Sequence, residues 1–281
     1  MKNFRVSFQG EPGAFSEQAA LAYFGTSCAV IARESFFDIF SDVTSHTSDF
    51  AVVPIENSLF GSVHQNYDLL QKFNVFIAGE ITLRVVMNLL ALPGVPLKNI
   101  REVYSHPQAL GQSEEFLRKL KNVTIHPYYD TAGAAKMIAS EHRTDAAAIA
   151  SARAAKHYHL HMLHTGIETD RQNFTRFLII TRKPAEPKRE AKTSIIFATK
   201  NIPGSLFHSL AVFALRNINL LKIESRPMVG TPWEYLFYLD IQADARQKEC
   251  VNALRHLQEL TTYFKNLGSY EIGRTISDLK L

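Results

Sequence analysis

About 180 residues at the start of the chain alternate short apolar segments with segments that have a helical hydrophobic period. The apolar segments are residues 4–8, 28–32, 50–55, 101–105, 123–128 and 145–150. The helical segments are residues 16–25, 35–43, 106–120, 131–142 and 151–159. Parallel strands need a long crossover between them, usually a helix. The alternation therefore predicts βαβ units, mostly parallel sheets and an α/β fold.

These units form two groups, roughly residues 1–80 and 85–165, which predicts two lobes with a cleft between them. The segment NFTRFLII (173–180) is apolar enough to be a buried strand that returns to the sheet of the first lobe. Its Thr175 and Arg176 place a hydroxyl and a charge where the chain leaves a loop and enters a core. We therefore treat both as candidate functional residues.

A basic segment, RKPAEPKREAK (182–192), ends this region. Pro184 and Pro187 block regular structure, and the charges follow no apolar period. Because no aromatic residues are interleaved, the segment is more typical of a solvated linker than of a nucleic-acid surface. The predicted organisation is a domain at residues 1–183, a linker at 184–191 and a second domain at 192–281.

The second domain has a different order of elements. Strands are predicted at 192–200, 218–228, 234–242 and 266–273, with helices after Pro203 and within 246–264. Proline is favoured in the first turn of a helix, and apolar residues recur at helical spacing in both helices. The order βαββαβ predicts a ferredoxin-like domain. Since that fold hosts many functions, it does not identify one.

Composition limits the class of protein. The chain has 281 residues, 46% hydrophobic and 21% charged, which suits two globular domains with ample cores. It contains no apolar run long enough to span a bilayer, and its first residues lack the apolar stretch of a signal peptide. Cys28 and Cys250 are far apart, which fits a reducing compartment. We expect a cytoplasmic protein that binds neither nucleic acid nor membrane.

The first candidate site follows the first predicted strand, in GEPGAFSEQAA (10–20). Gly10 and Gly13 flank a tight loop, and Ser16 is placed to cap the next helix. A strand, a glycine loop and a helix start present free N–H groups to an anion. The spacing is not that of a dinucleotide fingerprint, so the two interpretations are a carboxylate site and a structural turn.

Three further polar clusters stand at the ends of predicted strands. VVPIENS ends in Asn57 and Ser58, which lie where open α/β sheets bind ligands but could also cap the next helix. In YSHPQALGQ, His106 precedes a helix-opening proline, a position that favours capping over chemistry. Gln108 and Gln112 of that segment share one helix face. Thr175 belongs to the third cluster, FTRF.

Two other patterns do not support a site. The segment HYHLHMLH brings His157, His159, His161 and His164 close in sequence, but strand alternation separates them and no carboxylate motif accompanies them. Surface histidines are the better interpretation. A hydrolase triad is disfavoured because no GxSxG motif occurs.

Five segments in order, GEPGAFSEQ, PIENSLFGSV, SHPQALGQ, NFTRF and KIESRP, resemble the prephenate dehydratase family over essentially the whole chain. The resemblance implies a two-lobed dehydratase domain of type 2 periplasmic-binding-protein architecture, followed by an ACT regulatory domain without chorismate mutase helices. One departure is Gly204-Ser205-Leu206, where the family has Gly-Ala-Leu. This change leaves the fold unaffected and bears only on effector affinity.

The resemblance also implies the reaction: prephenate loses carbon dioxide and water to give phenylpyruvate, without metal or cofactor, in phenylalanine biosynthesis. Thr175 would hydrogen-bond the leaving hydroxyl, Arg176 would hold a carboxylate or the loop, and Glu56 would be a possible proton source. The catalytic set carried over is Thr175, Glu56, Asn57, Ser105 and Gln112. The substrate-binding set is Gly13, Ala14, Phe15, Ser58, Arg176 and Phe177.

Regulation follows from the same resemblance. Phenylalanine would bind between paired ACT domains of a homodimer or homotetramer and inhibit the enzyme. The effector set is Gly204, Ser205, Leu206, Asn219, Glu224, Ser225 and Arg226. Two alternatives stay open. The substrate could be arogenate, the transaminated relative of prephenate, and a two-lobed sensor of aromatic acids would bind without turnover.

Overall fold

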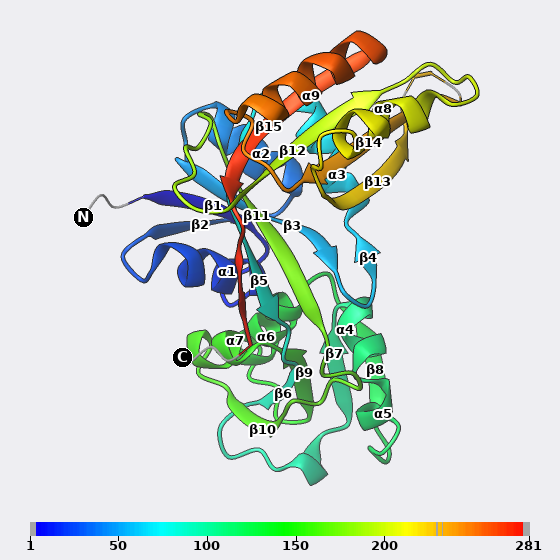
Figure 1. Cartoon of the computed structure of the whole chain (residues 1–281). Helices are drawn as coiled ribbons and strands as arrows, with labels where there is room; N and C mark the ends of the chain where they lie inside the picture. Colours follow the sequence, from blue (N-terminus) through cyan, green and yellow to red (C-terminus); the bar gives the residue numbers. More distant parts are fainter. Residues whose placement is uncertain (1–3, 229, 232, 278–281) are drawn as a thin grey trace.

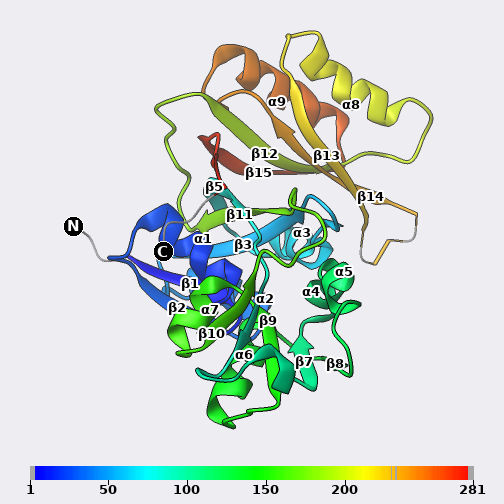
Figure 2. The ribbon, with the colours of Figure 1, turned by 90° about the horizontal axis from the view of Figure 1, so that it is seen from below.

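The computed structural model describes residues 4–228, 230–231 and 233–277. Three sheets build three stacked units, which both views separate clearly: the C-terminal domain, the first lobe and the second lobe (Figures 1 and 2). The two-lobed α/β architecture with an added βαββαβ unit agrees with the α/β fold class predicted from the sequence.

The first lobe is built on the sheet β16-β5-β11-β3-β1-β2, with β4 paired to β3. Its elements are β1 (Arg5–Gln9), α1 (Phe15–Phe24), β2 (Ala29–Arg33), α2 (Phe36–Thr44), β3 (Phe50–Asn57), β4 (Gly61–Ser62), α3 (His64–Lys72), β5 (Phe76–Arg84) and β11 (Phe174–Thr181). Strand β1 is parallel to β2 and β3, as the βαβ pattern predicts. Strand β11 runs antiparallel between β3 and β5. The returning segment therefore occupies the middle of the sheet.

The second lobe is built on the sheet β10-β6-β9-β7-β8. Its elements are β6 (Asn88–Ala91), η1 (Leu97–Asn99), β7 (Glu102–Ser105), α4 (Pro107–Gln112), α5 (Glu114–Leu117), β8 (Thr124–Pro127), α6 (Thr131–Ser140), β9 (Ala146–Ala150), α7 (Ala152–His157) and β10 (His161–Thr165). The single helix predicted at 106–120 is divided at Ser113, whose ψ of 16° departs from helical geometry.

The C-terminal domain has the predicted βαββαβ order: β12 (Ala191–Ala198), α8 (Ser205–Ala214), β13 (Leu220–Pro227), β14 (Tyr235–Ile241), α9 (Lys248–Leu260) and β15 (Tyr263–Glu271). Its sheet order is β13-β14-β12-β15. Helices α8 and α9 cover one face, and the other face turns toward the first lobe (Figure 2). Residues 182–190 carry no helix or strand, and the linker predicted at 184–191 lies in this stretch except for Ala191, which begins β12.

The predicted second domain at 192–281 needs one correction. The short strand β16 (Arg274–Ile276) pairs in parallel with β5, so the chain returns to the sheet of the first lobe. The side chain of Arg274 also donates to the carbonyl of Ala22 at 2.7 Å. The two domains are therefore joined by strand pairing as well as by the linker.

An apolar core fills the space between the first lobe and the C-terminal sheet. Buried side chains of β3 and β11 pack there against Ile196, Leu236 and Tyr238 of the C-terminal domain. Lys265 adds hydrogen bonds across this interface, because its Nζ donates to the carbonyls of Leu70 (2.8 Å) and Phe73 (2.5 Å) at the end of α3. A cation is favourable at a helix C-terminus, where carbonyl groups lack helical partners.

A buried group of ions crosses the same interface. Arg176 of β11 contacts Asp240 of β14 at 2.9 Å and Glu80 of β5 at 3.4 Å. Lys192 of β12 contacts Glu80 at 2.6 Å, and Ser194 donates to Asp240 at 2.6 Å. Burial acts to raise the pKa of Asp240, but the nearby Arg176 and Lys192 outweigh it and hold that pKa below its ordinary value.

Replacing Asp240 with Asn should lower the free energy of unfolding by about 3 kcal/mol, because Arg176 and Lys192 would share a single remaining buried carboxylate. With its pKa depressed, Asp240 stabilises the fold fully above about pH 4 and less as the pH falls through its folded pKa. The difference in melting temperature between the parent and the variant should therefore become smaller in acid. Glu114→Ala, which removes an exposed pair with Arg118, is the control and should change stability by less than about 0.5 kcal/mol. A melt of Asp240→Asn equal to the parent's would contradict this account.

Candidate active site

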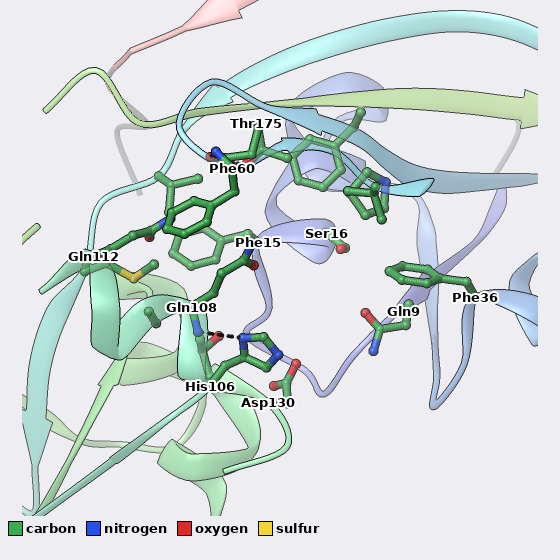
Figure 3. Close-up of a pocket in the computed structure, with 18 of the residues that line it drawn as sticks. Gln9, Phe15, Ser16, Phe36, Phe60, His106, Gln108, Gln112, Asp130 and Thr175 are labelled. Carbon is green, nitrogen blue, oxygen red and sulfur yellow. Dashed lines mark hydrogen bonds between the residues drawn. The ribbon is translucent and has the colours of Figure 1, made fainter. Parts of the chain in front are cut away.

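A cavity of about 420 Å³ lies between the two lobes, large enough for a small organic molecule (Figure 3). All of its described lining residues belong to the two lobes or to the strands that connect them. The first lobe contributes residues of β1, α1, β3, β4 and β11, and the second contributes α4 and the start of α6. The strand-end clusters marked in the sequence therefore meet at one place.

An irregularity in β3 orients the residues at the cavity. Thr175 pairs with Asn57 and Arg176 with Glu56, but the next residue of β11, Phe177, pairs with Pro54. The residue in between is an extra one in β3, and such a bulge changes which face the following side chains occupy. Asn57 and Thr175 consequently line the cavity together.

Glu56 and Arg176 occupy the opposite face of these strands. Glu56 contacts Lys222 of the C-terminal domain at 2.8 Å and Arg176 at 3.5 Å. Neither Glu56 nor Arg176 lines the cavity. The structure thus corrects two predicted roles: Arg176 binds carboxylates of the protein, and the carboxyl group of Glu56 lies across the sheet from Thr175.

A chain of amide side chains fixes the hydrogen-bond direction at Thr175. Asn57 Oδ1 accepts from the backbone N–H groups of Leu59 (2.9 Å) and Phe60 (3.1 Å), so its Nδ2 must face the other way. That Nδ2 donates to Thr175 Oγ1 at 3.0 Å and to Asn173 Oδ1 at 2.8 Å. Because Thr175 Oγ1 is an acceptor here, its own O–H is left to donate into the cavity.

The chain continues to the second lobe. Asn173 Nδ2 donates to Gln112 Oε1 at 2.8 Å, which leaves the Nε2 hydrogens of Gln112 for the cavity that this residue lines. Gln108, four residues earlier on α4, also lines the cavity, as the shared helix face predicts. Two hydrogen-bond donors, Thr175 and Gln112, therefore face the same space from two lobes.

Other residues of these segments hold the frame. Ser105 is fully buried and its hydroxyl donates to the carbonyl of Ile149 at 2.6 Å, so it ties β7 to β9 and does not line the cavity. His106 lines the cavity and caps α4, since its Nδ1 accepts from the N–H of Gln108 at 3.3 Å. Ser58 is exposed, and its hydroxyl donates to the carbonyl of Gln172 at 2.6 Å.

The glycine loop holds the two lobes together. The N–H of Gly13 donates to Glu17 at 2.6 Å and its carbonyl accepts from Ser151 at 2.6 Å. Its φ is +95°, and an added Cβ would lie 2.7 Å from the Cα of Ala154, so only glycine fits this contact. Gly13 and the adjacent Ala14 do not line the cavity, which corrects their predicted role. Ser16 is not the helix cap, because α1 starts at Phe15; it lines the cavity instead.

The cavity wall combines aromatic surface with a nearly uncharged polar set. Phe15, Phe60 and Phe177 line it, and the first and last of these were predicted to bind substrate. Among the described lining residues there is no lysine or arginine, and Asp130 is the one carboxylate. The first residues of helices α1, α2 and α6 line the cavity, so the positive dipole ends of these helices lie near it. Such a site suits an anion without a strong counter-charge.

The histidine-rich segment lies away from the cavity. His157 belongs to α7, His161 and His164 to β10, and all three are exposed, as is His159 between them. Over the described ranges, no three His, Cys, Asp or Glu side chains are grouped as a metal site requires. None of the helices in the described part of the chain combines the length and apolarity of a membrane-spanning segment.

The predicted effector residues divide into two groups. Gly204, whose φ is +81°, precedes α8, and Ser205 and Leu206 are the first two residues of that helix. The side chain of Asn219 donates to the side chain of Gln242 at 3.2 Å. On β13, Ser225 is exposed, but its neighbours face the first lobe. Glu224 accepts from Ser62 at 2.5 Å, and Arg226 donates to Asp68 at 2.8 Å. These two charged groups are therefore engaged by the first lobe and are not available for an amino acid in this arrangement.

The sequence matches the family model described as prephenate dehydratase over residues 6–185. The chain belongs to the prephenate dehydratase family. The relative named arogenate dehydratase/prephenate dehydratase 2, chloroplastic, from Arabidopsis thaliana is 47% identical over 97% of this chain and 74% of its own length. The chain is accordingly a dehydratase, a lyase of aromatic amino-acid biosynthesis.

Two solved structures are similar over 95% of this chain, each with a TM-score of 0.87. A prephenate dehydratase from Arthrobacter aurescens in complex with L-Phe is 28% identical, with 89% of that chain covered. GqqA, described as a novel type of quorum quenching acylase, is 30% identical, with 98% covered. The expectation of a cytoplasmic protein is contradicted, because the similar Arabidopsis relatives are chloroplastic.

Sequence reasoning overlooked Asn173, Phe60 and Asp130. Asn173 is fully buried at the centre of the amide chain, although it opens the segment NFTRF that was singled out. A buried asparagine beside a candidate catalytic residue could have been marked, because buried amides need partners. Nothing in the pattern of the sequence places Asp130 at the cavity of this dehydratase.

Asn173→Ala should lower kcat/KM about 10-fold or more, because Asn57 and Gln112 lose the partner that fixes their orientation, a loss of roughly 1–3 kcal/mol. Initial rates with prephenate and with arogenate measure this. Asn252→Ala on α9, far from the cavity, is the matched control and should keep the parent rate. Parent-like rates for Asn173→Ala on both substrates would refute the orienting role.

Proposed function

We propose that this dehydratase converts prephenate or arogenate to an aromatic product in the cavity between its lobes. In this reaction the bond from the ring to its carboxyl carbon breaks, and the electron pair enters the ring. The C4–oxygen bond then breaks, and the departing hydroxide takes up a proton from solvent and leaves as water. Prephenate gives phenylpyruvate and arogenate gives phenylalanine. Aromatisation supplies the driving force.

The hydrogen bond from Asn57 Nδ2 to Thr175 Oγ1 is the observation that carries this proposal. It leaves the Thr175 hydroxyl free to donate to the departing oxygen, on which negative charge develops. A fixed donor of this kind stabilises the transition state more than the ground state. Gln112 Nε2 is a second donor on the same wall.

The absence of lysine and arginine from the described wall supports the decarboxylation step. A ring carboxylate held without lysine or arginine is weakly stabilised, which favours its departure as neutral carbon dioxide. Helix N-termini still attract the anion into the cavity. The phenylalanine rings at the wall match the flat carbon ring of the substrate.

The substrate preference is a separate question. The sequence led us to expect prephenate as the better substrate, and the comparisons do not decide between prephenate and arogenate. The relatives from Arabidopsis and Petunia that carry the name arogenate dehydratase favour the alternative. A sensor without turnover is the less supported alternative, because it would not need donors aligned on a leaving group.

Thr175→Ala should lower kcat at least about 100-fold on the better substrate while the melting temperature stays close to the parent's, because the lost donor acts in the transition state. Thr175→Ser keeps the hydroxyl and should retain much of the activity. Phenylpyruvate and phenylalanine formation from the two substrates measure both variants. Near-parental rates for Thr175→Ala, or no turnover of either substrate by the parent, would refute the proposed function.

We further propose that the C-terminal domain is an ACT regulatory domain that binds phenylalanine and inhibits the enzyme. Support comes from its βαββαβ order and from the L-Phe complex of the similar Arthrobacter aurescens enzyme. The loop of Gly204, Ser205 and Leu206, with Asn219 and Ser225 on or beside β13, forms the proposed site.

Pairing of two C-terminal domains is part of this proposal. Strand β13 is at the edge of its sheet, and its Leu221 and Ile223 are 42% and 44% exposed. An edge strand with exposed apolar side chains is suited to join a second copy. We expect a homodimer or homotetramer, with the effector near the paired edges.

Gly204→Val should weaken phenylalanine binding about 10-fold or more and leave the uninhibited rate within about twofold, since a β-branched residue is strained at φ +81° and distorts the loop. Gly166→Val is the matched control, because Gly166 has φ +62° in an exposed loop of the second lobe. Calorimetry gives the affinity, and light scattering should show a mass of at least two 31.7 kDa chains. Equal phenylalanine binding by parent and Gly204→Val would contradict this site.

A further inference from the structure

Asp130 is unusual among the carboxylates near the cavity. Three other carboxylates near the cavity segments each contact a lysine or an arginine within 3.1 Å. They are Glu11, Glu17 and Glu168. Asp130 lines the cavity, and none of the ion pairs between described residues includes it. A half-buried carboxylate without a cationic partner is costly unless something else supplies the charge.

The neighbouring histidine forms no ion pair with Asp130 among the described residues. His106 and Asp130 lie next to each other at the end of the cavity away from Thr175 (Figure 3). His106 Nδ1 accepts the hydrogen bond that caps α4. Burial raises the pKa of the Asp130 carboxyl above its ordinary value, although the N–H of Gly133 donates to it at 2.8 Å. The carboxyl group is thus held in place and lacks a counter-charge.

The position of Asp130 relates it to one part of the substrate. In prephenate and arogenate the hydroxyl carbon and the carbon that bears the side chain are opposite each other on the six-membered ring. When the ring hydroxyl of the substrate lies at Thr175, the side chain of the substrate therefore points to the far end of the cavity, where Asp130 lies (Figure 3). The side chains differ at one group, which is an ammonium in arogenate and a keto oxygen in prephenate.

We propose that Asp130 is a specificity-determining residue that accepts the ammonium group of arogenate, so that the enzyme prefers arogenate over prephenate. This inference rests on the proposed function. An ammonium donates to a carboxylate in a charge-assisted hydrogen bond, whereas a keto oxygen offers only acceptor lone pairs. Prephenate thus leaves Asp130 unpaired or protonated, and that difference discriminates between the two substrates.

The helix cap does not compete with this role. Asp130 Oδ1 accepts from Gly133 as the N-cap of α6, and a carboxylate has about four acceptor positions. The same cap keeps the carboxyl group from rotating. It also gives a clean test, since asparagine and serine cap a helix about as well as aspartate.

The experiment measures kcat/KM for arogenate and prephenate with the parent, Asp130→Asn and Asp130→Ser. We expect the parent to prefer arogenate, and both variants to lose about 10- to 100-fold on arogenate with prephenate unchanged or improved. Asp145→Asn, an exposed carboxylate of the second lobe paired with Arg143, is the matched control and should keep the parent's ratio. Thermal melts of all variants confirm that they are folded.

The outcomes separate the two claims. If the parent turns over a substrate but both Asp130 variants keep the parent's arogenate-to-prephenate ratio, the role of Asp130 is wrong and the proposed function stands. An equal loss on both substrates also overturns it, because that marks a structural role. A parent that turns over neither substrate overturns the proposed function and this inference together.

Discussion

Arg176 is the charge on which the arrangement of the cavity depends. It is buried between carboxylates of both domains, with Asp240 at 2.9 Å, Glu80 at 3.4 Å and Glu56 at 3.5 Å. Moving β11 by one residue would expose this charge to an apolar core and would turn Thr175 away from the cavity. Because breaking a buried ion pair costs about 3–5 kcal/mol, the ions fix the register of the strand that carries Thr175. The charge at the strand edge therefore positions the hydroxyl and does not itself face the cavity.

The sequence predicted the fold well because its signals were local and repeated. Alternating strands and helices, the proline-containing linker and the βαββαβ order all appear in the structure. The strand-end rule also brought Asn57, Thr175 and Gln112 to one cavity. The return of β16 to the first lobe was missed, because a strand of only three residues has no recognisable hydrophobic period.

The errors in the site have a common physical cause, which is the face that a side chain occupies. In FTRF and in PIENS, residues that line the cavity stand next to one that contacts the C-terminal domain. Alternation separates Thr175 from Arg176, and the bulge in β3 sets the face of Asn57. Since a bulge depends on pairing with a strand more than 100 residues away, residue spacing alone could not assign Glu56 or Arg176. Gly13 was predicted to bind substrate for a related reason. A glycine is required at this position because the backbone lies against Ala154 of the other lobe.

The same alternation defines how the C-terminal domain can influence the reaction. That domain contributes no side chain to the described wall of the cavity, so the regulation proposed above would have to pass through the first lobe. Three contacts are suited to this: Arg176 adjoins Thr175, Glu56 adjoins Asn57, and Ser62 both lines the cavity and donates to Glu224. Each places a residue bound by the C-terminal domain within one position of a cavity residue. A rotation of the C-terminal sheet that loosened these ion pairs would therefore disturb the donors at the leaving group directly. Coupling of this kind needs only a difference of about 1–3 kcal/mol between two arrangements, which is less than the ion pairs at this interface can supply.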